Sequence, residues 1–218
     1  MKHNFVILGD SYSTYEGFIP EGNKAYYSPT GCKPDHPVSI MDQKDTWWQR
    51  MMDATGANLV LNDSWSGSTI CYTGYVGDCS MTSSFIYRYR KMRYAGLFEK
   101  NDIDTFIIFG GTNDSWVPAP LGEVKLSDWT EADLYNALPA MCYLLATAKR
   151  DLPNTRIVFV MNCGIRQEIT SCIKMATEHF GIELVELHDI EKLTGHPTSL
   201  GMAQTCEQVM DVLAWETL

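Results

Sequence analysis

Three short segments, far apart in the 218-residue chain, place small polar residues after apolar runs or inside a turn. They are Gly9-Asp10-Ser11, Gly110-Gly111-Thr112-Asn113-Asp114 and Gly195-His196-Pro197. A serine hydroxyl, a carboxamide and an imidazole can act as nucleophile, hydrogen-bond donor and base, which are the groups that acyl transfer requires. We therefore interpret the three segments as parts of one active site.

Ser11 is the candidate nucleophile. It follows the apolar run at residues 5–8 and the glycine Gly9, which permits a tight turn. A serine hydroxyl is weak on its own and needs a base to take its proton. The alternative interpretation is that Asp10 and Ser11 only cap the turn that follows.

His196 is the candidate base among the five histidines of the chain. It lies between Gly195 and Pro197, in the loop expected before the last helix. Imidazole has a pKa near about 6.5, so it can accept a proton at neutral pH and return it to a leaving group. The alternative is a surface histidine that caps the helix.

Asn113 and Gly67 are candidate oxyanion donors. Asn113 follows two glycines and the apolar run at residues 104–109, and its carboxamide donates without carrying a charge. Gly67 lies in the loop at residues 62–69, where a backbone amide could be a second donor. Each such donor contributes about two to three orders of magnitude in rate. The alternative for both segments is an ordinary polar turn.

The elements that must position these residues alternate along the chain between strand-like and helix-like patterns, which predicts a doubly wound parallel sheet. Apolar runs predict strands at 4–8, 58–61, 104–109, 156–161 and 182–187. Caps and periodicity predict helices from 45 or 46 to Gly56, at 83–100, at 130–150 with a kink near Pro139, at 167–180 and at 199–215. We expect one domain over residues 1–218, with a long loop insertion at about 12–44.

Composition excludes several classes of function. The net charge of −10, without a basic run, argues against a nucleic-acid partner. No segment is long and apolar enough to span a bilayer, and the seven cysteines form no CxxC pair or zinc-ligand spacing.

We expect a cytoplasmic protein as given, or a secreted or periplasmic one if a signal peptide has been removed. The sequence does not indicate an oligomeric state.

Taken in chain order, Gly9-Asp10-Ser11, Gly67, Gly111-Thr112-Asn113-Asp114 and His196-Pro197 resemble the four motif blocks of the SGNH subgroup of the GDSL hydrolases. The resemblance spans nearly the whole chain. It implies a three-layer α/β/α sandwich with a central five-stranded, flavodoxin-like parallel sheet. It further implies that Ser11 is the nucleophile, His196 the base, and the amides of Ser11 and Gly67 with the Asn113 side chain the oxyanion hole, with no metal or organic cofactor.

One position departs from the family pattern. The usual histidine block has an aspartate three residues before the histidine, and this chain has Leu193 there. In catalytic triads the acid fixes the tautomer of the ring and stabilises the imidazolium. We predict that Asp189 takes that role. Glu191 or a backbone carbonyl are the alternatives, and a carbonyl would leave a Ser-His dyad.

Aromatic residues concentrate in the expected insertion and at 65–94. Aromatic faces among polar groups suit a sugar ring, so we expect an esterase acting on a small acyl ester, first of all an acetylated carbohydrate. The alternative for these rings is packing of the loops onto the domain. The alternatives for the function are an acyltransferase with the same Ser-His site and a catalytically inactive glycan-binding module.

Overall fold

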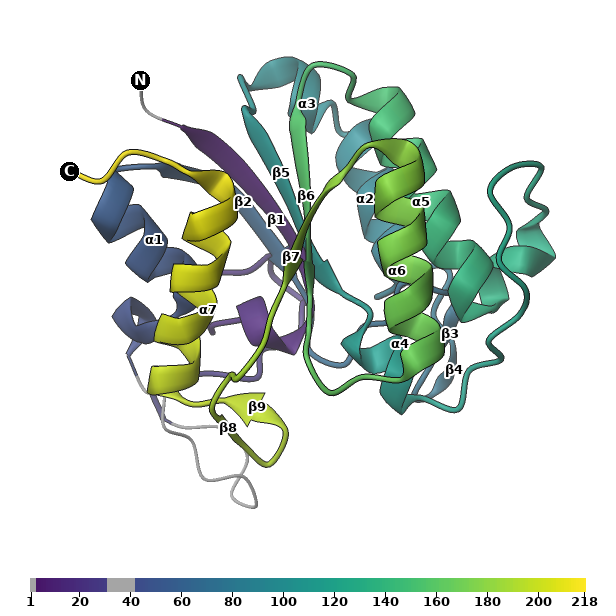
Figure 1. Ribbon diagram of the computed structural model, residues 1–218, viewed down its shortest axis with the longest axis horizontal. Helices are drawn as coiled ribbons and strands as arrows, with labels where there is room; N and C mark the ends of the chain where they lie inside the picture. The colour runs from purple at the N-terminus through teal and green to yellow at the C-terminus, as the bar shows by residue number, and fades with distance from the viewer. Residues whose placement is uncertain (1–2, 31–41) are drawn as a thin grey trace.

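A five-stranded parallel sheet lies between two layers of helices in the computed structural model, which describes residues 3–30 and 42–218 (Figure 1). The strands are β1 (Asn4–Gly9), β2 (Asn58–Ser64), β5 (Thr105–Gly110), β6 (Arg156–Met161) and β7 (Glu183–Glu186), in the order β2-β1-β5-β6-β7. All four strand pairs are parallel. This confirms the predicted α/β/α sandwich.

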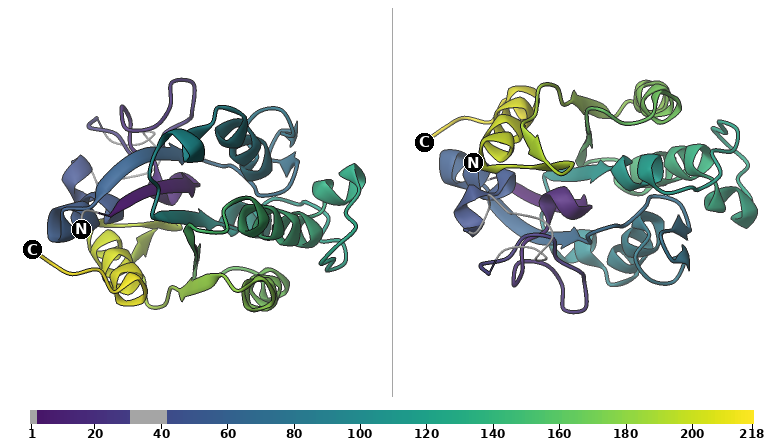
Figure 2. Two further views of the ribbon diagram at one scale, coloured as in Figure 1. Left: turned by 90° about the horizontal axis from the view of Figure 1, so that it is seen from above. Right: turned by 90° about the horizontal axis from the view of Figure 1, so that it is seen from below.

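Each face of the sheet has its own helices and its own core. Helices α1 (Trp47–Thr55) and α7 (Ser199–Leu213) cover one face; α2 (Phe85–Tyr94), α5 (Ala137–Asp151) and α6 (Gln167–Phe180) cover the other (Figure 2). Side chains of a strand alternate between the two faces. On β5, Ile107 and Phe109 therefore join the core under α1 and α7, while Phe106 and Ile108 join the core under α5 and α6.

Local signals in the sequence account for most helix ends. The Thr46 side chain accepts the Gln49 amide at the start of α1, and Gly56 ends that helix in the left-handed conformation at φ 68°. The predicted bounds of β6 and α6 agree with the structure to the residue. The strong apolar runs and the caps therefore predict these elements well.

Two helices differ from their predictions. The segment at 83–100 is α2 followed by the short α3 (Leu97–Lys100), separated at Gly96, whose φ of 72° is unfavourable for other residues. The segment at 130–150 begins with the predicted capping box, but it is a 3₁₀ helix, η3 (Glu131–Tyr135), and then α5. The predicted kink at Pro139 is wrong, because Pro139 lies in the first turn of α5, where its missing N–H has no helical acceptor.

Short elements that the sequence did not predict gather where the parallel strands end (Figure 1). They are the 3₁₀ turn η1 (Ser11–Ser13), the hairpin β3 (Thr73–Gly74) and β4 (Gly77–Asp78), the helix α4 (Thr112–Trp116), and the hairpin β8 (Lys192–Leu193) and β9 (His196–Pro197). A further 3₁₀ turn, η2 (Gln43–Asp45), precedes α1. The strand order reverses between β1 and β5, the position at which open α/β sheets bind ligands.

Residues 31–41 of the expected insertion lie outside the described part of the chain, so the division into one domain with an insertion at about 12–44 stays a prediction. Within residues 3–30 and 42–218, no helix is long and apolar enough to cross a membrane.

Candidate active site

Ser11 begins the η1 turn directly beyond the end of β1. The Asp10 amide bonds the Phe109 carbonyl of β5 at 3.2 Å, and the Asp10 carboxylate accepts the Tyr12 amide at 3.0 Å, which closes the turn. A Cβ at Gly9 would lie 2.4 Å from the Ser64 hydroxyl and 2.9 Å from the Ser13 Cβ, so a side chain at this position would collide with both serines. Ser11 is therefore held by both neighbouring strands and is 2 % exposed.

His196 lies on the hairpin β8–β9 rather than in an irregular loop. Thr194 and Gly195 form its two-residue turn, with φ of 49° and 84°, which matches the twist of antiparallel strands. The His196 ring nitrogen Nε2 lies 2.9 Å from Ser11 Oγ. The structure thus brings the predicted nucleophile and the predicted base within hydrogen-bond distance, although 184 residues separate them in the chain.

Two tyrosine hydroxyls attach this hairpin to the rest of the site. Tyr12, the neighbour of the nucleophile, donates to the Gly195 carbonyl, and Tyr27 donates to the Pro197 carbonyl at 2.9 Å. Burial raises the pKa of the Tyr12 hydroxyl, so it remains a proton donor at neutral pH. The carbonyls on both sides of His196 are therefore fixed.

Aromatic rings hold the His196 ring itself. The Tyr26 ring stacks on the imidazole with centroids 3.6 Å apart and planes at 6°, and Trp116 meets it at 65° and 5.9 Å. Tyr26 is tied to the nucleophile turn, because its amide bonds Thr14 Oγ1 and that hydroxyl donates to the Ser11 carbonyl. The face of an aromatic ring favours a cation, so this stack stabilises the imidazolium.

The prediction that Asp189 orients His196 is wrong for this arrangement. The Asp189 carboxylate lies 3.1 Å from the His188 ring, and its side chain is 96 % exposed. Leu187 and Ile190 turn into the core, which directs the two residues between them to solvent. Glu191, the alternative acid, accepts the Thr198 hydroxyl at the start of α7.

The register of the hairpin explains why the position of Leu193 matters. Leu193 pairs directly with His196 across β8–β9, and residues paired in this way carry their side chains on the same face. An aspartate three residues before the histidine would therefore lie beside the ring. In this chain an apolar side chain lies there.

Asn113, in the first turn of α4, lines the same cavity as Ser11. Its Nδ2 donates to the Ser68 carbonyl at 2.9 Å, its Oδ1 accepts the Tyr75 hydroxyl at 3.2 Å, and the residue is 2 % exposed. A carboxamide has two N–H donors. Among the described residues, one N–H of Asn113 bonds the Ser68 carbonyl, which leaves the second N–H for a ligand. Gly67, with φ 82°, lines the same cavity.

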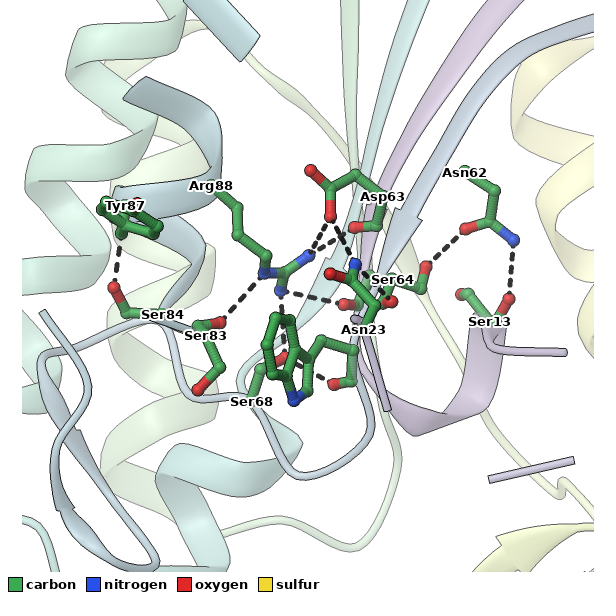
Figure 3. A network of polar contacts seen from close by, with 12 residues as sticks. Ser13, Asn23, Asn62, Asp63, Ser64, Ser68, Ser83, Ser84, Tyr87 and Arg88 are labelled. Carbon is green, nitrogen blue, oxygen red and sulfur yellow. Dashed lines mark hydrogen bonds and ion pairs between the residues drawn. The ribbon is translucent and has the colours of Figure 1, made fainter. Parts of the chain in front are cut away.

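A buried arginine connects the loops that carry these groups (Figure 3). The Arg88 guanidinium, on α2, donates to the Gly9 carbonyl at 3.0 Å, to Ser68 Oγ at 3.0 Å and to the Ser83 carbonyl at 2.9 Å. It also pairs with the Asp63 carboxylate at 3.2 Å and bonds the Asp63 carbonyl. We call these contacts the Arg88 network. It joins the end of β1, the end of β2 and the loop of Gly67.

Two buried carboxyl groups complete this region. The Asp114 carboxylate accepts the amides of Ile70 and Cys71 at 2.9–3.1 Å, which fixes the segment that follows Gly67. Burial raises the pKa of Asp114, and burial raises the pKa of Asp10 to about 7 although the Tyr12 amide and Arg88 oppose this shift. Asp10 therefore titrates near neutrality, one residue before the nucleophile.

A cavity of about 850 Å³ opens above Ser11, His196, Gly67 and Asn113. Tyr26, Trp65, Tyr75 and Trp116 form its aromatic walls, and Glu16 and Lys24 add charge.

Sequence reasoning missed Arg88, although an arginine on the apolar face formed by Phe85, Tyr89 and Met92 is a signal of a buried cation. It also missed the contacts of Tyr12 and Tyr26, which depend on tertiary structure.

Comparisons with known proteins agree with this arrangement. The model of the family described as GDSL-like Lipase/Acylhydrolase matches residues 3–213. A structure described as a GDSL-like lipase from Bacteroides uniformis is 39% identical, with a TM-score of 0.88 over 98% of this chain and 96% of that chain. One from Bacteroides ovatus is 38% identical, with a TM-score of 0.88 over 98% and 99%.

A more distant structure shares the fold. An acetyl xylan esterase from the rumen bacterium Butyrivibrio proteoclasticus is 16% identical, with a TM-score of 0.59 over 98% of this chain and 65% of that chain. None of the curated proteins compared with the chain matches it.

Replacing Arg88 by methionine will destabilise the fold strongly. The change leaves Asp63, whose side chain is 9 % exposed, without its cation, and breaking a buried pair in this way costs about 3–5 kcal/mol. Denaturant unfolding of Arg88→Met measures the loss. Lys91→Met, on the exposed face of the same helix, is the matched control and should stay within about 0.5 kcal/mol of the parent. Equal losses in both variants would contradict the role of the Arg88 network.

The raised pKa of Asp10 predicts a specific pH dependence of stability. Between about pH 4 and pH 7 the unfolded chain releases the Asp10 proton and the folded chain retains it, so the free energy of unfolding falls as pH rises. The slope is about 1.4 kcal/mol per pH unit over that window. Asp10→Asn removes this contribution, and the difference between the two stability curves isolates it. Parallel curves for parent and variant would show that Asp10 is ionised throughout.

Proposed function

The chain belongs to the GDSL-like lipase/acylhydrolase family, and from this premise we propose that it is a serine esterase that cleaves small acyl esters. One observation carries the proposal. Ser11 Oγ lies 2.9 Å from His196 Nε2 at the switch point of the sheet, which is the geometry of an activated serine nucleophile.

The proposed reaction has two halves. In the first, Ser11 Oγ attacks the ester carbonyl while its proton passes to His196 Nε2, and a tetrahedral oxyanion forms. The imidazolium then gives this proton to the oxygen of the leaving alcohol, and the acyl group remains on Ser11. In the second half, water loses a proton to His196 and its oxygen attacks the acyl carbonyl. The bond to Ser11 Oγ then breaks, the acid is released, and His196 returns the proton to Ser11 Oγ.

Three donors support the proposed oxyanion hole. They are the backbone amides of Ser11 and Gly67 and the second N–H of the Asn113 carboxamide. Their strength depends on preorganisation, because donors that are already fixed do not have to reorient when the charge develops. The contact of Asn113 with the Ser68 carbonyl and the Arg88 network beneath supply this rigidity.

The imidazolium that forms during the reaction needs stabilisation. The stacked Tyr26 ring supplies part of it through its negative face, and Tyr12 and Tyr27 keep the hairpin in place while the ring gains and loses its proton. Packing against aromatic rings thus contributes to the orientation of the proposed base.

An acetylated carbohydrate is the substrate that the cavity favours. Its walls combine aromatic faces, which suit the C–H faces of a sugar ring, with serine and threonine hydroxyls that suit sugar hydroxyls. A volume of about 850 Å³ is sufficient for a short oligosaccharide. The fold of the chain also occurs in an acetyl xylan esterase, which is consistent with this substrate class.

Substitution of the proposed nucleophile and base will abolish ester hydrolysis. Ser11→Ala and His196→Ala should each lower kcat for p-nitrophenyl acetate by at least about 10³-fold, because each removes one half of the attacking pair. His188→Ala, which changes an exposed histidine beside Asp189, is the matched control and should keep the parent rate. Near-parent activity in Ser11→Ala would refute the proposal.

The substrate class can be tested separately at Trp65. Trp65→Ala removes an aromatic wall that a sugar ring contacts and p-nitrophenyl acetate does not need. We expect KM for an acetylated xylo-oligosaccharide to rise about tenfold, which corresponds to the loss of one aromatic contact. KM for p-nitrophenyl acetate should change less than about twofold. An equal change for both substrates would argue against a carbohydrate ester.

A further inference from the structure

Tyr75 stands at the tip of the β3–β4 hairpin, outside the central sheet. The hairpin is anchored at its base, where the Tyr72 amide bonds the Leu134 carbonyl and Thr73 Oγ1 donates to the Tyr135 carbonyl, each at 2.8 Å. Tyr75 is 55 % exposed and Val76 beside it 97 %. A tyrosine at such a tip has no role in the core, so its position needs another explanation.

The Tyr75 hydroxyl contacts the group that the proposed oxyanion hole depends on. It donates to Asn113 Oδ1 at 3.2 Å, while Asn113 Nδ2 donates to the Ser68 carbonyl at 2.9 Å. The two bonds hold the carboxamide at both ends. With one N–H on Ser68, they direct the second N–H of Nδ2 away from that carbonyl.

A donor on the amide oxygen also changes the strength of the amide N–H. Hydrogen bonds in a chain polarise one another, by about 10–30% per bond, so a bond accepted at Oδ1 strengthens donation from Nδ2. Burial raises the pKa of the Tyr75 hydroxyl, which keeps its proton available for this bond.

The Tyr75 ring has a second effect on the same place. It lies 3.7 Å from the position that a Cβ on Gly67 would occupy, so the ring packs beside Gly67. Tyr75 thus bonds one proposed oxyanion donor, Asn113, and lies close to the loop of another, Gly67.

We propose that Tyr75 is a positioning residue of the esterase site, which orients and polarises the Asn113 carboxamide toward the developing oxyanion. The inference rests on the proposed function, since it assigns Tyr75 a role in that reaction. Tyr75 acts through Asn113 and does not itself contact the reacting atoms.

A double-mutant cycle tests this. Tyr75→Phe removes the hydroxyl and keeps the ring, and it should lower kcat for p-nitrophenyl acetate about three- to tenfold, the effect of losing one hydrogen bond, with KM nearly unchanged. Asn113→Ala should lower kcat about 10²–10³-fold. In the Asn113→Ala background, Tyr75→Phe should have no further effect, because its partner is gone.

Control variants separate the possible outcomes. Tyr94→Phe makes the same change at a tyrosine that is 90 % exposed at the end of α2 and should leave kcat at the parent value. Thermal unfolding of each variant checks the fold. If Tyr75→Phe leaves kcat unchanged, or lowers it equally with and without Asn113, the inference is overturned while the esterase proposal stands. If Ser11→Ala retains activity, the proposed function itself fails.

Discussion

The interaction on which the site depends is the buried ion pair between Arg88 and Asp63. At the ends of parallel strands, backbone carbonyls leave the ladder and must find other donors. A guanidinium carries five N–H groups in a rigid fork, so one side chain can serve several such acceptors at once. In this chain the acceptors of Arg88 lie at the end of β1, at the end of β2, in the loop of Gly67 and just before α2. The nucleophile turn and the loop of the oxyanion donors are therefore positioned relative to one cation.

The base is held in a different way. A carboxylate that orients a catalytic histidine supplies both direction and negative charge. Among residues 3–30 and 42–218, the position opposite His196 in the hairpin holds Leu193, and the ring is contacted by a stacked Tyr26 and the edge of Trp116, while two tyrosine hydroxyls bond the neighbouring carbonyls. Tyr12 joins the two halves of the site, because it follows Ser11 in the chain and bonds Gly195, the residue before His196.

The sequence predicted what is local. Apolar runs and caps located the five strands and most helices, and strand ends indicated which polar residues would meet. Ser11, Gly67, Asn113 and His196 do lie around one cavity. The sequence could not predict contacts that depend on packing between distant segments. Asp189 lies near His196 in sequence but turns outward because Leu187 and Ile190 fill the core. The helical spacing of Arg88 with Phe85, Tyr89 and Met92 indicates that it is buried, but its bonds to Gly9, Asp63 and Ser68 depend on the tertiary fold.

The separation of the β8–β9 hairpin from the central sheet has a consequence for how the protein loses activity. Within residues 3–30 and 42–218 the hairpin is a two-stranded sheet of its own, and bonds from Tyr12, Tyr27 and Lys192 are among those that join it to the rest. Segments of this kind open by local unfolding at a lower free energy than the strands of a buried sheet. On this argument His196 leaves Ser11 while the five strands stay paired, so we expect heat inactivation at a lower temperature than melting of the sheet.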